Sequence, residues 1–173
     1  AQLYGLLTEY VLDVESSDET VALQMELATL ALEHLSDAEG TIEHYATVLS
    51  LQPNHKAARI GLEGLLNQSA VRAEAARSLK GIYETLELWS DLVPALEVLI
   101  EEESDVDARR ELLESLVHVL TEELDDPSRA MPNAGVLFEN FPERTQYLDL
   151  FLELARKTRA WTEPTWHDAS GPG

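Results

Sequence analysis

The sequence predicts an all-helical fold in which antiparallel helix pairs stack side by side. Apolar residues recur at spacings of three and four, as in Val21, Met25, Ala28, Leu32 and Leu35, and no segment keeps the alternation of a strand. Connections of two or three residues require consecutive helices to pack antiparallel. We expect helices near residues 2–15, 18–35, 38–51, 54–67, 70–87, 90–103, 105–124, 127–140 and 143–160.

Individual helices carry further signals in their sequences. The segment 18–35 has a second apolar set, which includes Leu23 and Leu27, so neighbours must cover this helix on two sides. Start signals recur as a serine followed three residues later by an acid, a spacing that satisfies free N–H groups at a helix start. They are Ser16 with Glu19, Ser36 with Glu39, and Ser104 with Asp107.

An internal repeat relates residues 1–66 to residues 90–155 with an offset of 89 and no gap. Such units cannot bury their apolar faces alone and stack into a solenoid. The offset contains about five helices, whereas alternating helix pairs repeat after an even number. Either residues 54–87 contain an extra helix, or two of the expected helices are one. The matched pairs include Leu3 with Leu92, Leu7 with Leu96, Leu27 with Leu116, Asp37 with Asp126, Pro53 with Pro142, and Leu65 with Leu154.

Residues 36–54, SDAEGTIEHYATVLSLQPN, resemble the second half of a tetratricopeptide repeat. Looser copies occur around residues 83–100 and 125–142, and we expect Pro132 and Gly135 to shorten or distort the helix of the latter. The match is one of pattern, so HAT-type or HEAT-type helical repeats stay open as alternatives. The resemblance implies a right-handed α–α superhelix over residues 1–160 that binds proteins, with Tyr45 and Trp89 as candidate binding residues.

The ends of the chain give weaker signals. Residues 161–173 are rich in proline, glycine and small polar residues, which predicts a tail or linker. The first residues lack the pattern of a signal peptide, and no apolar run is long enough to span a membrane. The chain starts without methionine, which suggests a piece of a longer protein. The sequence does not determine the compartment, and the lack of a signal peptide and of a membrane span favours a cytoplasmic location.

The charge is strongly negative and unevenly distributed. A net charge of −21 repels nucleic acids and anionic membranes, so we expect neither as a partner. Residues 84–107 contain nine acids and no base, whereas residues 54–80 contain more bases than acids. We expect two neighbouring patches of opposite sign that bind a protein or peptide, including a cationic one, or mediate self-association. The candidate binding cations are Lys56, Arg59, Arg72, Arg77 and Lys80.

Signals for catalysis or cofactor binding are missing from the sequence. It has no cysteine, no Gly-x-Ser-x-Gly, no phosphate-binding glycine loop and no Glu-x-x-His. His118 and Glu122 lie one helical turn apart, but we expect a surface hydrogen bond there rather than a metal site. We therefore expect no catalytic residue, metal or cofactor. The function that we favour is a protein-binding or scaffolding module; the alternatives are a structural spacer and a helical enzyme of unrecognised type.

Overall fold

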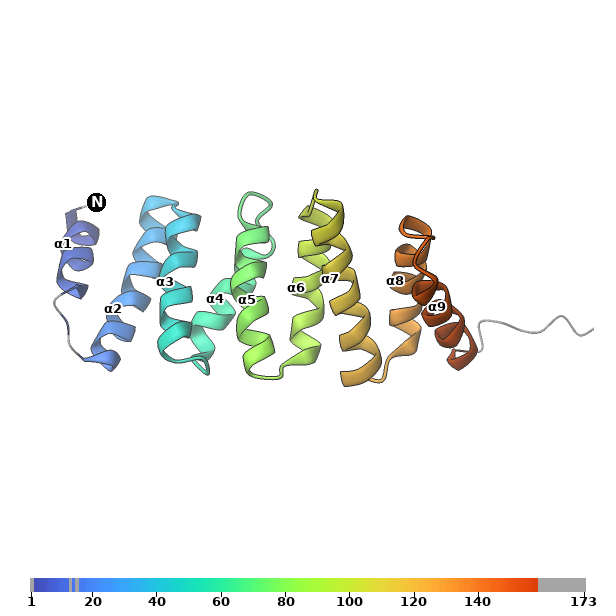
Figure 1. The fold of residues 1–173 in the computed structure, drawn as a ribbon. Helices are drawn as coiled ribbons and strands as arrows, with labels where there is room; N and C mark the ends of the chain where they lie inside the picture. The colour runs from blue at the N-terminus through green and yellow to red at the C-terminus, as the bar shows by residue number, and fades with distance from the viewer. Residues whose placement is uncertain (1, 13, 15, 159–173) are drawn as a thin grey trace, which may run out of the picture. The chain divides into compact units, whose positions relative to one another are not determined.

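In the computed structural model, which describes residues 2–12, 14 and 16–158, the chain is all-helical (Figure 1). The described residues form nine α-helices and two short π-helical segments, η1 and η2, and contain no strand. The all-helical prediction is confirmed, and each expected helix corresponds to an observed one. The elements are α1 (Gln2–Val11), α2 (Ser17–Leu30), η1 (Ala31–Leu35), α3 (Ala38–Leu51), α4 (Lys56–Leu65), α5 (Arg72–Thr85), α6 (Trp89–Glu102), α7 (Val106–His118), η2 (Val119–Glu123), α8 (Pro127–Asn140) and α9 (Thr145–Lys157).

The structure decides between the two explanations of the odd number of helices. Residues 54–87 contain two separate helices, α4 and α5, and no two expected helices merge into one. The predicted tail at residues 161–173 lies outside the described residues.

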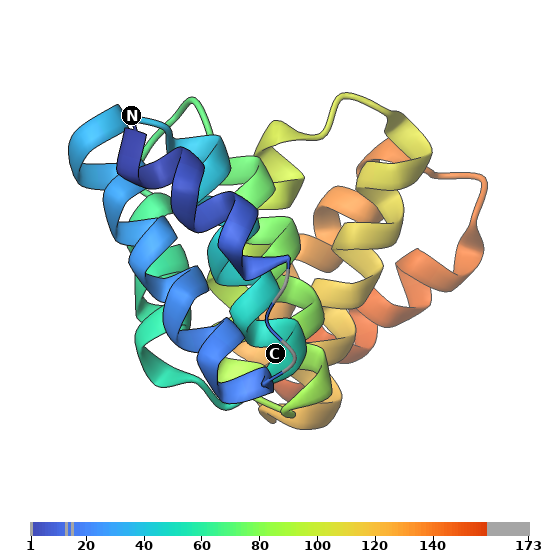
Figure 2. The same cartoon turned by 90° about the vertical axis from the view of Figure 1, so that its left-hand side faces the viewer.

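The chain divides into two compact units, Ala1–Leu112 and Leu113–Gly173, with the division inside α7. In the first unit, each helix from α1 to α6 packs on the next one along the chain. In addition, α3 contacts α5. Figures 1 and 2 show α1 beside α2. The second unit contains the end of α7 with η2, α8 and α9; α8 packs on both η2 and α9.

Two turns in the chain have the same construction. Ser36 and Asp125 adopt left-handed backbone conformations with φ of 54° and 48°, and each follows a π-helical segment. In each case the next residue, Asp37 or Asp126, is the N-cap of the following helix and accepts a hydrogen bond from the backbone N–H three residues on. The two turns are 89 residues apart, in agreement with the offset found in the sequence.

The predicted caps are right at one helix start and wrong by one residue at two. Ser16 does accept a hydrogen bond from Glu19 N, at 3.4 Å. At the other two starts the aspartate after the serine is the cap: Asp37 accepts from Gly40 N and Asp105 from Ala108 N. Ser36 instead takes the left-handed position of the turn.

The expected shortening of the helix at Pro132 and Gly135 is wrong. The helix α8 runs from Pro127 to Asn140, fourteen residues, as many as α3. The low helix propensity of these two residues is offset by packing, because Ala130, Ala134 and Leu137 on the same helix are fully buried.

The helices α2 and α7 start 89 residues apart, and the buried leucines on them occupy corresponding positions. Leu27 has 0% and Leu116 1% of its surface exposed, as expected for equivalent core residues.

Substitution of either leucine by alanine should lower the free energy of unfolding by about 2–5 kcal/mol, through lost apolar contact and a residual cavity. Calorimetry of the two variants measures this. Leu12→Ala is the control: Leu12 is 81% exposed, and the change there should stay within about 0.5 kcal/mol. Full stability of both core variants would contradict the equivalence.

A close contact between α3 and α4 forms where Tyr45 meets Gly61. A Cβ atom at Gly61 would lie 2.4 Å from Cε2 of the Tyr45 ring, whereas a Cβ atom at Gly64 on the same helix meets nothing within 4 Å. The Tyr45 ring is only 8% exposed, so its neighbours restrict its movement. The glycine at 61 therefore allows α3 and α4 to approach.

The two glycines of α4 should respond to alanine in opposite directions. Gly64→Ala should raise stability by up to about 1 kcal/mol, because alanine favours the helix. Gly61→Ala carries the same helix gain but forces the Tyr45 ring to move, and should destabilise the protein. Chemical denaturation of the pair measures the difference. A stabilising Gly61→Ala would contradict the close packing described here.

Candidate functional site

A cavity of about 230 Å³ opens in the second unit. One wall carries polar residues from α7 and η2 at successive turns, Glu114, His118 and Glu122, of which His118 and Glu122 are exposed. Residues from α8 and α9 complete the lining, among them Leu137, Tyr147 and Leu150. The cavity therefore combines an acidic wall with an apolar one.

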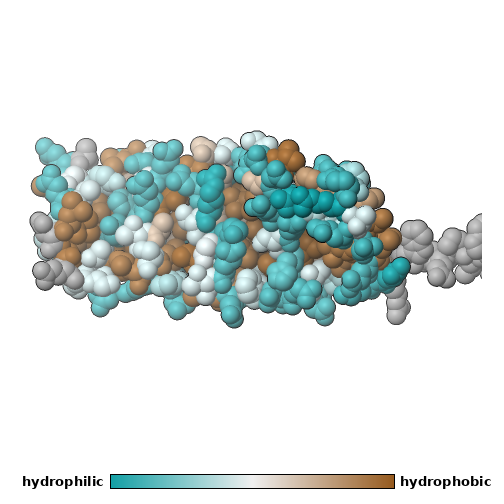
Figure 3. Space-filling view, viewed as in Figure 1, coloured by the Kyte–Doolittle hydropathy of each residue, from teal (hydrophilic) through white to brown (hydrophobic). Residues whose placement is uncertain are grey.

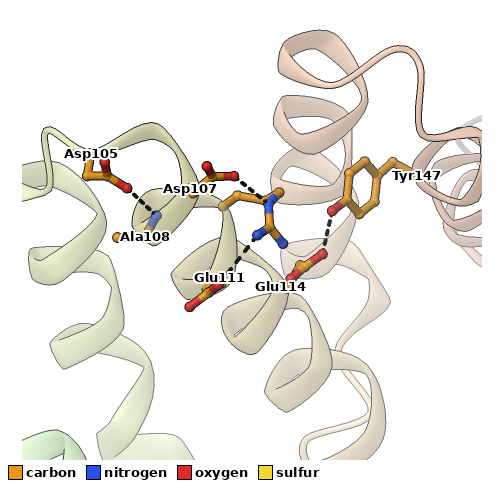
Figure 4. Close-up of polar contacts among 7 residues, drawn as sticks. Asp105, Asp107, Ala108, Glu111, Glu114 and Tyr147 are labelled. Atoms are coloured by element: carbon orange, nitrogen blue, oxygen red, sulfur yellow. Dashed lines mark hydrogen bonds and ion pairs between the residues drawn. The ribbon is translucent and has the colours of Figure 1, made fainter.

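A hydrogen bond across this cavity joins α9 to α7 (Figure 4). The hydroxyl of Tyr147 donates to Oε1 of Glu114. The Tyr147 side chain is 3% exposed, so its hydroxyl needs a partner inside the protein, and the Glu114 carboxylate provides one. Its ring also meets Phe141 edge-on, with 6.2 Å between ring centroids. These contacts hold the Glu114 carboxylate at the cavity.

The sequence analysis noted His118 and Glu122 but missed Glu114 and Tyr147. A signal was present in the 89-residue offset, which aligns Glu114 with Met25 and Tyr147 with Ala58. An apolar and a small residue are thus replaced together by a hydrogen-bonded pair.

The five candidate cations all lie in the first unit, and ion pairs involve three of them. Arg72 contacts both Glu101, at 2.9 Å, and Glu102, at 2.6 Å, and so links the start of α5 to the end of α6. Arg59 lies 3.5 Å from Glu63 on α4, and Lys80 lies 2.8 Å from Glu84 on α5. The charges of the two expected patches therefore partly neutralise each other, through pairs within α4 and α5 and through the pairs between α5 and α6.

Lys56 and Arg77 are exposed and form no ion pair with other described residues. Lys56 begins α4 beside an open hollow of about 500 Å³ that the α3–α4 turn lines. These two cations stay accessible for binding, whereas Arg59, Arg72 and Lys80 have acidic neighbours.

The acidic turn between α6 and α7 is also committed to local contacts (Figure 4). Glu103 accepts a hydrogen bond from Asp105 N at 2.9 Å, Asp105 caps α7 through Ala108 N at 2.8 Å, and Asp107 lies 3.5 Å from Arg110 Nε. Asp105 and Asp107 lie at the start of α7, where acids stabilise a helix, whereas Glu101 and Glu102 at the end of α6 pair with Arg72. Part of the charge in the two predicted patches therefore serves to connect α5 to α6 and to cap α7.

The two aromatic candidates differ in accessibility. Tyr45 is buried between α3 and α4, and burial raises its pKa. Its ring is a packing element. Trp89 begins α6 and is half-buried, so part of its indole surface can still meet a partner.

Two further polar clusters in the first unit join helices. Tyr83 is 2% exposed and donates to Glu63 Oε1 at 2.8 Å; burial and this hydrogen bond both raise its pKa. The hydroxyl oxygen of Tyr4 lies 2.8 Å from Nε2 of His44, and Nδ1 of the same ring lies 2.7 Å from Oε1 of Gln24. Burial lowers the pKa of His44, and in the neutral ring Nδ1 donates to Gln24 while Nε2 accepts from Tyr4. Both clusters connect neighbouring helices of the first unit.

Within residues 2–12, 14 and 16–158, no group of three or more histidines and acids is placed to hold a metal ion. None of the helices in these ranges has the length and hydropathy needed to cross a bilayer. Comparisons with family models, curated proteins and solved structures find no match. We therefore infer the function from the geometry of the cavity.

The contribution of the Tyr147–Glu114 hydrogen bond to stability can be compared with that of an exposed tyrosine–glutamate hydrogen bond. Tyr147→Phe should destabilise the second unit by about 1.5–3 kcal/mol, because it removes a hydrogen bond to a carboxylate from a buried phenol. Tyr10 donates to Glu19 Oε1 at 3.1 Å on the surface, so Tyr10→Phe should cost less than about 0.5 kcal/mol. Thermal unfolding of both variants tests the difference. Equal effects would show that the cavity pair contributes no more than a surface contact.

Proposed function

We propose that this chain is a non-catalytic protein-binding module that holds a basic side chain of a partner in the cavity of the second unit. The observation that carries the proposal is the pairing of an acidic wall, Glu114 and Glu122, with the apolar residues Leu137 and Leu150. A lysine or arginine has the matching form, an apolar stem with a charged end. The stem would lie against the leucines and the charge would face the carboxylates.

The electrostatics of this unit support a cationic partner. The described residues that line the cavity include the carboxylates of Glu114 and Glu122, and none of them is a lysine or arginine. Attraction between opposite charges is stronger beside a partly enclosed wall than in open water. The net charge of −21 would also speed the encounter with a basic partner.

The wider architecture that we propose is a superhelix of degenerate tetratricopeptide-like helix pairs. It is supported by the short turns between helices and by the cap and turn geometry that recurs after 89 residues. In such an array the binding groups lie on a scaffold whose own residues mainly pack. The alternative function, a structural spacer, has no need of a cavity with an acidic wall.

Selection of random peptides on the immobilised chain tests the proposed function. We expect enrichment of peptides in which lysine or arginine is flanked by apolar residues, and binding that weakens from low to high salt. Glu122→Lys should weaken the binding of a selected synthetic peptide by at least about tenfold in Kd, equivalent to about 1.4 kcal/mol. Fluorescence anisotropy with the labelled peptide gives the affinity.

Glu143→Lys is the matched control, because Glu143 is an exposed acid of the same unit outside the cavity lining. This change alters the net charge equally and should shift the affinity by no more than about twofold. Equal losses in the two variants would attribute binding to overall charge rather than to the cavity. Failure to select any peptide would favour the spacer.

A further inference from the structure

The polar wall of the cavity in the second unit carries a histidine between two acids. His118 lies with Glu114 one helical turn before it and Glu122 one turn after it, and all three line the cavity. Histidine is the side chain that changes its charge between about pH 5 and pH 8. The charge of this ring therefore bears directly on the binding of a basic side chain in the cavity.

The ring of His118 is accessible to a ligand. The residue is exposed, and its ring forms no hydrogen bond or ion pair with another described residue. The backbone at this wall, in contrast, is held by Thr121, which also lines the cavity. The Thr121 hydroxyl donates to the backbone carbonyls of Val117, at 2.9 Å, and of His118, at 3.2 Å.

Acids provide the charge that faces the ring. Among the described lining residues, α7 and η2 contribute the carboxylates of Glu114 and Glu122, and α9 contributes the phenol of Tyr147. This phenol is neutral, because its hydroxyl donates to Glu114. The lining residue from α8 is the apolar Leu137, and Figure 3 shows apolar surface beside hydrophilic surface where α8 and α9 lie. With a neutral ring, the wall is therefore negatively charged.

A lysine outside the lining lies near the same acids. Lys157 on α9 pairs with Glu153 at 2.9 Å, which raises the pKa of Lys157, and Glu122 and Asp125 raise it by smaller amounts. Carboxyl, phenol and ammonium groups ordinarily titrate outside the range from about pH 5 to pH 8. Histidine is thus the type of side chain at this wall that responds within that range.

The two forms of the ring have opposite effects on a bound cation. A neutral imidazole has one acceptor nitrogen, which can accept an N–H of a lysine or arginine beside the carboxylates. An imidazolium has two donors and no acceptor, so it repels the cation and pairs with the acids one turn away. Acidification must therefore weaken the binding of a basic side chain.

We propose that His118 makes the cavity a pH-sensitive site, which holds a basic side chain of a partner while the ring is neutral and releases it when the ring is protonated. This pH dependence rests on the proposed function, because its ligand is the basic side chain held in the same cavity. Linkage makes the effect reciprocal: a bound cation opposes the protonation of His118.

Peptide binding at two pH values tests the proposal. The probe is a labelled, selected peptide that contains lysine or arginine but no histidine or acid. Its Kd should rise at least about fivefold from about pH 7.5 to about pH 5.5 at constant ionic strength, because a positive charge is added beside the ligand. His118→Gln stays neutral and should bind within about threefold of the wild type at the higher pH, with most of the pH dependence lost. His118→Lys should bind weakly at both pH values.

His34→Gln is the matched control, because His34 is an exposed histidine of η1 in the first unit. This variant should keep the full pH dependence. An equal Kd at both pH values in the wild type, or an undiminished pH dependence in His118→Gln, would overturn the proposal. The loss of affinity in Glu122→Lys would in that case still support the proposed function. Equal binding by Glu122→Lys and the wild type would overturn both.

Nuclear magnetic resonance gives a second measurement through linkage. If protonation of the ring weakens the peptide about fivefold, the bound peptide must lower the pH midpoint of the His118 ring signal by about 0.7 unit. Titrations of the chain with and without the peptide measure this change, and the His34 signal should not move. An unchanged midpoint for His118 in the complex would overturn the proposal, even where the affinity falls with acid.

Discussion

The fold depends on one constraint: its helices carry apolar faces that become stable only when neighbouring helices cover them. The helix α6 packs on α5 and has six buried residues, whereas no described residue of α1 is buried. Tight turns with a left-handed residue at Ser36, Glu87 and Asp125 keep successive helices close enough for this mutual covering. The close approach of α3 and α4 at Gly61 and Tyr45 serves the same end.

Polar groups in this structure mostly support that packing. Arg72 ties α5 to α6 through two carboxylates, Tyr83 ties α5 to α4 through Glu63, and His44 connects α3 to α1 and α2. The cavity of the second unit is different, because the exposed residues Glu122 and His118 line its opening. That difference is the reason why the cavity, rather than the charged segments of the sequence, supports the proposed function.

The errors of the sequence analysis have local physical causes. Serine and aspartate both cap helices, and where they are adjacent, as in Ser36–Asp37 and Ser104–Asp105, the backbone path of the turn selects the aspartate. Helix propensity at Pro132 and Gly135 is a weak term beside the burial of Ala134 and Leu137. The partners of Arg72 could not be assigned from the sequence, because its side chain reaches carboxylates on another helix. The pairs Arg59–Glu63 and Lys80–Glu84, in contrast, have the spacing of four residues that favours ion pairs within one helix.

The sequence by itself determined the helices, their order and the 89-residue spacing, because apolar periodicity, caps and short connections are properties of neighbouring residues. It also indicated Leu27 and Leu116 as core residues, and both are buried. Only the tertiary structure decided which cation Glu101 and Glu102 pair with, that Tyr147 meets Glu114 at a cavity, and that Tyr45 packs against Gly61. These features depend on distances between residues far apart in the chain, which periodicity does not encode.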